Sequence, residues 1–501
     1  SLTDFDALTE PDYIDGSTTE FSSRSIFGRV TYTYDSRYLF EANVRYDGSS
    51  RFPSGNRFGF FPSMSAGYRI SEEPFMQSLK PYLSTLKIRG SWGMIGNQDV
   101  GTDRYISTLS TSVDSWIIDG KKVQSTQKPT IVSSTLTWEK VTTLDLGLDA
   151  RFFNDALGVT FDWYNRTTSD ILTTANLPAT LGADAPYENM GTIQTKGWEL
   201  AIDYRHTFKN GLHFGVTASV ADDKTEVTKW TYNTKIPSYG ATGWWDKSAY
   251  KEGMVLGDIW GLQFDRFLTE DDFNADGSLK AGLPDQTKVF PAGYQFAPGD
   301  VLYKDLDNNG EIVKQTNTND KGDLSVIGNA LPRLQFGLNL DAAWKGFDIS
   351  MFFQGVAKRK LWAAGNQVLP GFTTGEPFYK GAEDYWTPEN TDAFYPRPMD
   401  YKQSASGNYS VNDRYLLNMA YLRLKTFTVG YSLPKVWLSK FKVQGLRVYF
   451  TGENLFTIDG VKPAIDPEIG IRTASGKSDQ RNFGRSYPYQ KTVSFGIQLS
   501  L

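Results

Sequence analysis

The sequence predicts an all-β protein whose antiparallel strands form a transmembrane barrel. Three observations support this prediction. Apolar and polar residues alternate in segments of about 9–11 residues, the length that a tilted strand needs to cross a bilayer. Tight turns alternate along the chain with connections of tens of residues, as expected for a barrel with one short-turned and one long-looped rim. No run of about 18 apolar residues exists, so the sequence predicts no membrane helix.

The clearest element is a hairpin over residues 144–165, which turns at Asn154-Asp155. A period of two places alternate residues on opposite faces of a strand. One face carries carboxylates, Arg, Gly and hydroxyls. The other face is apolar, with Leu144, Leu146, Leu148, Ala150 and Phe152 before the turn and Leu157, Val159, Phe161 and Trp163 after it. Such a hairpin suits a soluble sheet or a membrane barrel, and the other segments favour the barrel.

The remaining elements follow in order, roughly fourteen strands in all. Asn-Gly at 210–211 is a strong hairpin signal. Residues 47–62 read as a loop, and residues 95–137 as a polar segment with one strand pair. The other expected strands and hairpins lie at 30–46 (turning at 35–37), 63–71, 84–93, 198–220 (turning at 209–211), 334–353 (turning at 345–346), 420–432, 445–456 and 493–501.

The expected organisation is an irregular segment at 1–24 followed by barrel from 25 to 501. Two connections, about 224–330 and 356–418, are long enough to be extracellular loops. Aromatic residues gather at strand ends, as in the girdles that mark the two membrane interfaces. They include Tyr32, Tyr34, Tyr38, Trp163, Tyr164, Trp344 and Phe347.

Composition excludes several functions. The 501 residues contain no Cys and only two His, His206 and His213, so thiol chemistry, disulfides and Cys/His zinc sites are excluded. The net charge of -5 has no long runs, which gives no indication of nucleic-acid binding. No nucleophile–base motif and no phosphate-binding Gly loop occurs. The sequence therefore predicts a protein that is not an enzyme.

Short motifs in a fixed order resemble a known family over nearly the whole chain from about residue 25. They are Phe27-Gly-Arg-Val-Thr-Tyr, Arg45-Tyr-Asp-Gly-Ser-Ser-Arg-Phe, Phe60-Phe-Pro-Ser, Leu86-Lys-Ile-Arg-Gly-Ser-Trp-Gly, Gly96-Asn-Gln, Leu136-Thr-Trp-Glu, Asp170-Ile-Leu, Gly191-Thr-Ile-Gln-Thr-Lys-Gly-Trp-Glu-Leu, Ile327-Gly-Asn, Tyr385-Trp-Thr-Pro-Glu-Asn, Tyr421-Leu-Arg-Leu-Lys and Gly452-Glu-Asn-Leu-Phe-Thr. Together they resemble the SusC-like (RagA/SusC) TonB-dependent transporters of the outer membrane of Bacteroidetes.

The resemblance implies the C-terminal portion of a barrel of about 22 strands, with an N-terminal plug that is not in this chain. Another polypeptide or an N-terminal segment is expected to supply the first strands and the plug, because an incomplete sheet would leave open edges in lipid. Other implied partners are a SusD-like surface lipoprotein, the TonB complex acting through the plug, and membrane lipids. The implied cargo is an oligosaccharide or a peptide, and the Trp and Tyr content of the loops favours glycan.

One acidic loop is a candidate Ca²⁺ or Mg²⁺ site. Asp305, Asp307 and Asn309 place oxygen ligands at alternate positions, with Gly310 following for the sharp turn. Thr316 occupies the position where a calcium loop has an acid. The resemblance adds Asp320 and Asp323, and Glu311 completes the predicted set. The alternative is a solvated Asp/Asn/Gly turn.

Aromatic and charged residues complete the candidate sites. Aromatic rings stack on the apolar faces of sugars, so loop aromatics are candidates for cargo contact, although packing within loops is the alternative; they are Trp244, Trp245, Trp260, Tyr385 and Trp386. Charged residues on the polar strand faces are expected to line the lumen and hold a plug by ion pairs; they are Asp145, Asp149, Arg151, Asp162, Glu199, Asp203 and Arg205.

The sequence therefore predicts TonB-dependent import of large nutrients, most simply oligosaccharides, with peptide import as the nearest alternative. Two other functions stay open. One is a soluble glycan-binding or glycan-cleaving β-protein, for which detergent-free release would be diagnostic. The other is a barrel that serves as a scaffold for a surface assembly, which copurifying proteins would reveal.

Overall fold

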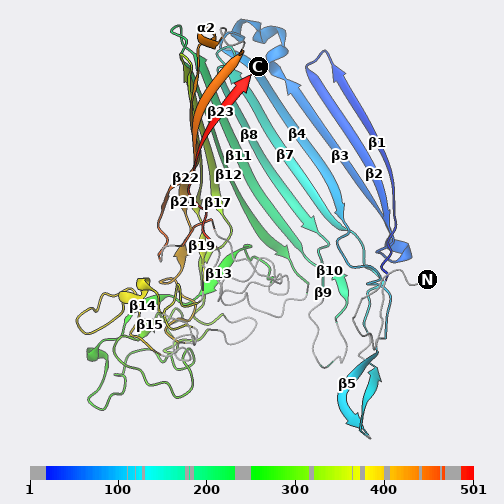
Figure 1. The fold of residues 1–501 in the computed structure, drawn as a ribbon. Coiled ribbons are helices and arrows are strands. Elements are labelled where there is room, and N and C mark those ends of the chain that lie inside the picture. Colours follow the sequence, from blue (N-terminus) through cyan, green and yellow to red (C-terminus); the bar gives the residue numbers. More distant parts are fainter. Residues whose placement is uncertain are drawn as a thin grey trace.

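Thirteen long strands of the described residues form one antiparallel sheet in the computed structural model (Figure 1). The structure describes residues 18–500 apart from 110, 119, 127–129, 175–179, 181–184, 232–249, 315–320, 364, 373–377, 400–406, 439–442, 463–464 and 469–486. In spatial order the strands are β1 (Ser23–Tyr34), β2 (Tyr38–Ser49), β3 (Phe58–Arg69), β4 (Leu83–Asn97), β7 (Glu139–Phe152), β8 (Leu157–Ser169), β11 (Thr192–Thr207), β12 (His213–Lys229), β17 (Arg333–Trp344), β18 (Phe347–Lys358), β21 (Tyr421–Ser432), β22 (Gly445–Asp459) and β23 (Thr492–Ser500).

Shorter elements lie in the connections. Five two-stranded sheets are formed by β5 (Thr111–Ile118) with β6 (Lys121–Thr126), β9 (Leu172–Thr174) with β10 (Tyr187–Asn189), β13 (Asp258–Gly261) with β16 (Ser325–Asn329), β14 (Phe264–Phe267) with β15 (Val301–Tyr303), and β19 (Lys360–Leu361) with β20 (Leu417–Asn418). The described helices are η1 (Ser54–Asn56), η2 (Ile70–Glu72), η3 (Pro74–Leu79), η6 (Glu270–Asp272), η7 (Lys380–Glu383) and α2 (Lys435–Leu438). None of the described helices is long and apolar enough to cross a membrane.

The predicted hairpin at 144–165 is present as β7 and β8. Leu148 pairs with Phe161 and Leu146 with Trp163, so the apolar residues of the two strands share one face. The turn between them runs through Phe153, Asn154 and Asp155, all with positive φ. Asn and Asp tolerate this left-handed conformation better than most residues, which explains why the chain reverses here.

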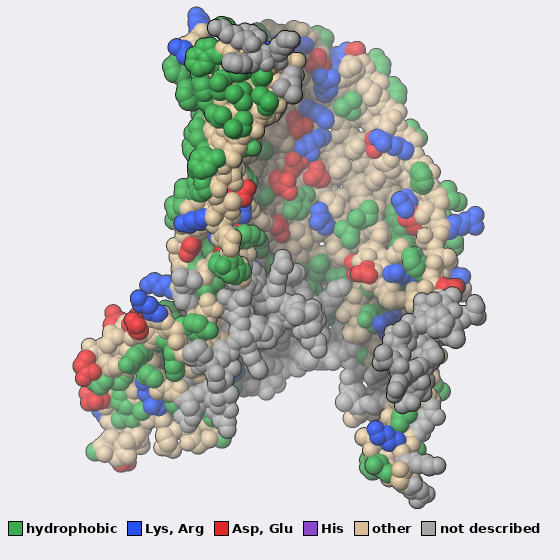
Figure 2. Space-filling model, in the orientation of Figure 1, with side chains coloured by type: hydrophobic (Ala, Val, Ile, Leu, Met, Phe, Trp, Pro, Cys, Tyr) green, Lys and Arg blue, Asp and Glu red, His purple; other side chains and the backbone are tan. Residues whose placement is uncertain are grey.

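The two faces of the sheet differ in chemistry. Figure 2 looks onto the hollowed side of the sheet, where acidic and basic side chains gather over the tilted strands. The register places every predicted charged lumen residue on this side. Leu146 is 50% exposed and Phe161 37% exposed on the opposite side, and Phe336 shares that side through its pairing with Val220. We call the polar side the lumen face and the apolar side the outer face.

The two rims also differ, as predicted. Short turns join the strands at one rim, at the top of Figure 1, and long connections leave the other. Aromatic rings gather near the short-turn rim, where Tyr38 stacks on Tyr68 with ring centroids 5.0 Å apart and Phe347 contacts Tyr431 at 4.5 Å. The predicted girdle at this rim is therefore present in the structure.

Several strands are longer than the sequence predicted. Residues 47–62 were expected to form a loop, but β2 continues to Ser49 and β3 begins at Phe58. The reason is a contact between strands, because Gly48 pairs with Phe58 and the Tyr46 ring stacks on Phe58 with centroids 5.0 Å apart. The β4, β12 and β22 strands likewise extend several residues further toward the long loops. Composition alone does not reveal such cross-strand stabilisation.

A bulge interrupts β21. Phe352 and Phe353 of β18 are consecutive, yet they pair with Thr426 and Leu424, so Lys425 is an extra residue in β21. Bulges of this kind bend a strand and redirect its side chains. Arg423 and Thr426 consequently lie on the same face of the sheet although they are three residues apart.

Candidate functional site

The lumen face is organised around Arg89 of β4. Its Nη2 donates to Asp162 Oδ2 at 2.7 Å and its Nε to Asp149 Oδ2 at 3.2 Å, while Nη1 lies 3.6 Å from Asp145 Oδ1. The guanidinium passes over Gly147, where any side chain would collide with it. Three predicted lumen acids are thus joined by a cation that the sequence analysis did not select. Its position on the polar face of a predicted strand was the available signal.

A second pair lies nearer the short-turn rim. Arg151 of β7 reaches across β8 and donates to both carboxylate oxygens of Asp203 of β11 at 3.1 and 3.2 Å. Gly158 lies between them and leaves the necessary space. Glu199 and Arg205 are exposed on the same face, and the structure records no side-chain partner for them among the described residues. Most of the predicted charges therefore pair within the wall, and these two remain open to whatever fills the lumen.

Further ion pairs continue this pattern around the sheet. Arg447 of β22 donates to Asp348 of β18 at 2.5 and 3.0 Å, and Arg29 of β1 pairs with Glu41 of β2. Such partly exposed pairs contribute about 0–1 kcal/mol each, so their main effect is to keep the wall polar. A cavity of about 520 Å³ opens on this wall over Thr160, Ser219 and Gly337.

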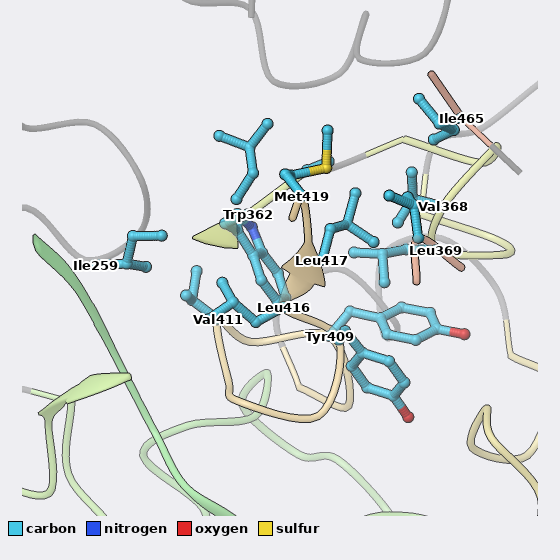
Figure 3. Packing of buried hydrophobic residues seen from close by; sticks show 14 of the residues in the cluster. Ile259, Trp362, Val368, Leu369, Tyr409, Val411, Leu416, Leu417, Met419 and Ile465 are labelled. Carbon is cyan, nitrogen blue, oxygen red and sulfur yellow. The ribbon is translucent and has the colours of Figure 1, made fainter. Parts of the chain in front are cut away.

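The β12–β17 and β18–β21 connections pack together below the barrel rim of Figure 1, and we call them the loop body. One apolar cluster, shown in Figure 3, joins Ile259 and Ala330 of the β12–β17 connection to Trp362, Leu369 and other residues of the β18–β21 connection. A second cluster surrounds Tyr303 and Leu324. The two predicted extracellular loops therefore share their cores and are not independent loops.

The loop aromatics have different positions. Trp386 is only 7% exposed and lies in the second cluster, and Trp260 packs against the same cluster. In this structure the Trp386 ring takes part in loop packing, which was the alternative to cargo contact. Tyr385 is 41% exposed and lines a cavity of about 430 Å³ with Phe378, Tyr379, Pro396 and Pro398, among others. Trp244 and Trp245 lie outside the described residues.

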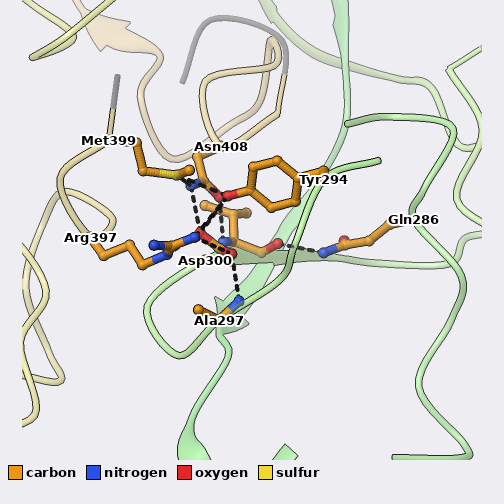
Figure 4. A network of polar contacts seen from close by, with 8 residues as sticks. Gln286, Tyr294, Ala297, Asp300, Arg397, Met399 and Asn408 are labelled. Atoms are coloured by element: carbon orange, nitrogen blue, oxygen red, sulfur yellow. Dashed lines mark hydrogen bonds and ion pairs between the residues drawn. The ribbon is translucent and has the colours of Figure 1, made fainter. Parts of the chain in front are cut away.

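A buried carboxylate joins the two connections, as Figure 4 shows. Asp300 is fully buried and accepts hydrogen bonds from Arg397 Nε at 2.8 Å, Tyr294 Oη at 2.9 Å, Asn408 Nδ2 at 2.9 Å and the backbone N–H of Ala297 at 2.9 Å. Burial and the charge of Asp300 raise the pKa of Tyr294 well above its usual value, which keeps the hydroxyl a donor. The sequence analysis gave no indication of this network, since its members are far apart in the chain.

The predicted metal loop brings three carboxylates together. Oxygen atoms of Asp305, Asp307 and Asp323 lie within 4.8 Å of one another. Asp323 is fully buried and accepts from the backbone N–H groups of Leu306 and Val313, each at 2.7 Å. Asn309 Nδ2 donates to Asp307 Oδ2 at 3.0 Å. Three of the six predicted ligands thus come together, and Asn309 contacts one of them through its amide N–H.

The other two predicted ligands do not. Glu311 forms an ion pair with Lys288 and is not part of the cluster, while Asp320 lies outside the described residues, as does Thr316. Hydrogen bonding by the backbone of Gly310 lowers the pKa of Asp305, whereas burial, helped by the charge of Asp323, raises the pKa of Asp307. Three close carboxylates with partial mutual repulsion are suited to a hard divalent cation.

Comparison with known proteins identifies the family to which this two-faced sheet belongs. The family model "TonB dependent receptor-like, beta-barrel" matches residues 2–455. The chain belongs to this family. Barrels of this family lie in the outer membrane, so this chain is part of an outer-membrane barrel and not a soluble β-protein.

Individual relatives agree with the resemblance to SusC. TonB-dependent receptor P3 of Formosa agariphila is 28% identical over 487 residues, which cover 95% of this chain and 45% of the relative. TonB-dependent receptor SusC of Bacteroides thetaiotaomicron is 27% identical over 494 residues, covering 95% and 43% respectively. The chain spans less than half the length of these curated relatives.

A solved structure shows the same fold. The structure of the RagAB peptide transporter matches with a TM-score of 0.71 at 21% identity, covering 99% of this chain and 49% of that one. The predicted fold class, a portion of a TonB-dependent transporter barrel, is confirmed by this match and by the family model.

Proposed function

We propose that this chain forms the C-terminal wall and the loop body of a TonB-dependent importer of large nutrients. The observation that carries the proposal is the contrast between the two faces of the 13-stranded sheet, a charged lumen face and an apolar outer face. A wall of this kind encloses a wet path through lipid. The chain itself contributes surfaces for binding and no covalent chemistry.

Several partners belong to this proposal. Within the described structure β1 and β23 each pair on one side only, and unpaired strand edges are very costly in lipid. Further strands and a plug would complete the barrel, and Glu199 and Arg205 would be free to pair with that plug. Similarity to SusC and to the RagAB structure supports a SusD-like surface lipoprotein on the long-loop rim, with the TonB complex supplying energy through the plug.

For the cargo we propose oligosaccharides. The support is the cavity beside Tyr385, where Phe378 and Tyr379 also expose their rings and Lys380 and Glu383 provide polar groups. Exposed rings flanked by hydrogen-bonding side chains suit the apolar and hydroxylated faces of sugars. The RagAB structure is that of a peptide transporter, so peptide is the alternative cargo class.

The proposed function is tested by uptake. A strain that lacks the protein carrying these 501 residues is complemented with the intact gene or with Tyr379→Ala/Tyr385→Ala, and growth on oligosaccharide mixtures is compared with growth on peptides. We expect growth on one glycan class to require the intact gene, with the double variant impaired about tenfold or more in uptake rate. Phe75→Ala, which alters an exposed ring in η3 at the opposite rim, is the control. Loss of growth on peptides alone would establish the alternative cargo, and normal growth on both would refute the importer.

We also propose that the acidic loop binds Ca²⁺ through Asp305, Asp307, Asn309 and Asp323. Oxygen ligands and the turn at Gly310 support Ca²⁺ over softer metals. Calcium titration followed by amide exchange is the test. Slower exchange at residues 305–313 upon adding Ca²⁺, and its loss in Asp307→Asn, is the expected result. Identical exchange with and without the ion would identify the loop as a solvated turn.

A further inference from the structure

Two cations lie at the long-loop end of β21. Arg423 is only 3% exposed although it belongs to the lumen face, where it is opposite Gln354 of β18 and Thr457 of β22. Its Nε donates to Thr457 Oγ1 at 2.8 Å. Lys425, the extra residue of the β21 bulge, brings an ammonium to the same place as the Arg423 guanidinium.

Two carboxylates from the β22–β23 connection cover these cations. Asp466 Oδ1 accepts from Arg423 Nη2 at 2.6 Å, and Glu468 accepts from Lys425 Nζ at 2.9 and 3.1 Å. Asp466 also accepts from the backbone N–H groups of Glu468 and Tyr489, each at 3.0 Å. The Tyr489 ring lies over both cations, 4.7 Å from Lys425 Nζ and 5.4 Å from Arg423 Cζ.

We call residues 465–468 the strap. Ile465 is buried in the apolar cluster of Figure 3, with residues of the two other long connections. The strap therefore joins the loop body to the lumen face of the wall. Ile465 contacts the loops, whereas Asp466 and Glu468 contact β21.

The charged contact is a poor choice for stability alone. Apolar residues of similar volume usually stabilise a buried site as well as an ion pair does, because desolvation offsets the attraction between the charges. Arg423 Nη1 lies 3.1 Å from Glu468 Oε2, but it makes no aligned hydrogen bond within the described part of the structure. A buried donor left in this way costs free energy. The contact specifies a position without making it as stable as an apolar contact would.

We propose that the strap is a releasable closure, latched to the lumen face by Arg423 and Lys425, and that its release exposes these two cations as a binding pair for carboxylate groups. In the latched state, Asp466 and Glu468 occupy the place that a carboxylate of the cargo would take after release. A guanidinium beside an ammonium matches a carboxylate through short charge-assisted hydrogen bonds. The inference rests on the proposed importer for its cargo, but the latch itself does not depend on transport.

Amide exchange on the intact protein in detergent tests the latch. The isosteric variant Asp466→Asn/Glu468→Gln removes both negative charges. We expect exchange at residues 465–468 to become about tenfold faster, because charge-assisted hydrogen bonds are lost. Glu226→Gln, which neutralises an acid 3.6 Å from Lys224 on the exposed end of β12, is the matched control and leaves the strap unchanged. Unchanged exchange in the double variant would show that the apolar contacts hold the strap, and would overturn the proposal.

Charge-reversal variants distinguish release of the strap from a folding defect in the wall. Lys425→Glu and Glu468→Lys each place like charges together and are expected to release the strap, whereas the two together restore an opposite pair and slow exchange again. Faster exchange throughout β21 and β22 in the single variants, without rescue in the double variant, would mean that the wall itself is damaged and would contradict the latch.

Binding of tri-galacturonate, measured calorimetrically, tests the exposed pair. We expect binding to Asp466→Asn/Glu468→Gln to be at least about tenfold tighter than to the wild type. Adding Arg423→Gln/Lys425→Gln should abolish that gain. No difference between the first variant and the wild type would refute the binding pair. The two proposals can fail separately. If both amide-exchange tests support the latch but the uptake assay shows no transport, the latch is established and the importer is refuted.

Discussion

At the scale of single residues, Asp300 is predicted to have the largest effect on the loop body. Asp300→Ala leaves the Arg397 guanidinium and the Asn408 amide without their acceptor. Removing one partner of a buried pair typically costs about 3–5 kcal/mol. We therefore expect local unfolding of the contact between the two long connections, measured as faster amide exchange around residues 297–301. Glu389→Ala, at an exposed position of the β18–β21 connection, is the control and should change stability by roughly 0.5 kcal/mol or less.

Asp272 gives a prediction for pH. Its carboxylate accepts from both terminal nitrogens of Arg266 at 2.6 and 2.7 Å and from the backbone N–H of Thr269, and these bonds lower the pKa of Asp272 to about 2. A depressed pKa stabilises the fold above the ordinary value of 3.8, and this stabilisation is lost as pH falls through about 2. The contribution is roughly 2 kcal/mol.

The measurement is urea unfolding of the loop body, followed by tryptophan fluorescence between pH 5 and pH 2. Asp272→Asn should remove this part of the pH dependence while leaving the remainder. An equal loss of stability with falling pH in the wild type and in Asp272→Asn would show that Asp272 contributes nothing to it.

The alternation of polar and apolar residues with a period of two predicted which residues line the lumen, but it did not predict which residues they contact. Asp145, Asp149 and Asp162 were expected on the polar face and are there. Arg89, which joins them, lies about 60 residues earlier in the chain and becomes a neighbour only when β4 pairs with β7. For Trp386 the sequence left cargo contact and loop packing as alternatives. An aromatic ring in a loop has the same sequence signature whether it faces cargo or a core, and here it is buried.

At the scale of elements, the two faces of β12 allow a direct test of membrane exposure. Val220 and Ser219 are consecutive, but Val220 pairs with Leu200 and Phe336 on the outer face while Ser219 pairs with Ala201 and Gly337 on the lumen face. An arginine on the lipid face costs about 2–4 kcal/mol near the bilayer centre. We expect Val220→Arg to lower the free energy of unfolding by about 2–4 kcal/mol and to reduce the yield of folded protein.

Ser219→Arg is the matched control, because it places the same arginine one position away, on the lumen face. It should be nearly neutral for stability in urea titrations in lipid vesicles. Equal destabilisation by the two substitutions would contradict the assignment of faces.

The hairpins were predictable because their signals are local. Asn210-Gly211 and Lys345-Gly346 occur at tight turns with positive φ at Gly211, Lys345 and Gly346. Strand ends were not predictable. Residues 47–49 and 58–62 contain glycine and proline, and they are strands because aromatic rings on neighbouring strands stack on one another. The small sheets of the connections, such as β14 with β15, likewise depend on pairing across tens of residues.

At the scale of the whole molecule, the apolar outer face predicts how the protein leaves its membrane. Carbonate and high salt remove proteins held by charge, whereas a barrel in contact with acyl chains is released only by detergent. We therefore expect the protein to remain in the outer-membrane pellet after both washes and to dissolve in detergent. Release by carbonate alone would contradict the barrel.

Proteins that copurify with this protein from the detergent extract also show which partners it has. A single surface lipoprotein that copurifies with the protein would support the importer, and a larger set of proteins would support the scaffold alternative. A peripheral lipoprotein of known anchorage in the same membrane serves as the extraction control.

The extra residue in β21 has a consequence for insertions and deletions. Phe352 and Phe353 pair with Thr426 and Leu424, so a chain shortened by Lys425 would regain plain alternation without moving any neighbour to the other face. Arg423 would stay in the lumen and Leu424 would stay against hydrocarbon. In-frame loss of this codon should therefore straighten the strand and leave its side chains on their present faces, whereas loss of either neighbouring codon would not spare them.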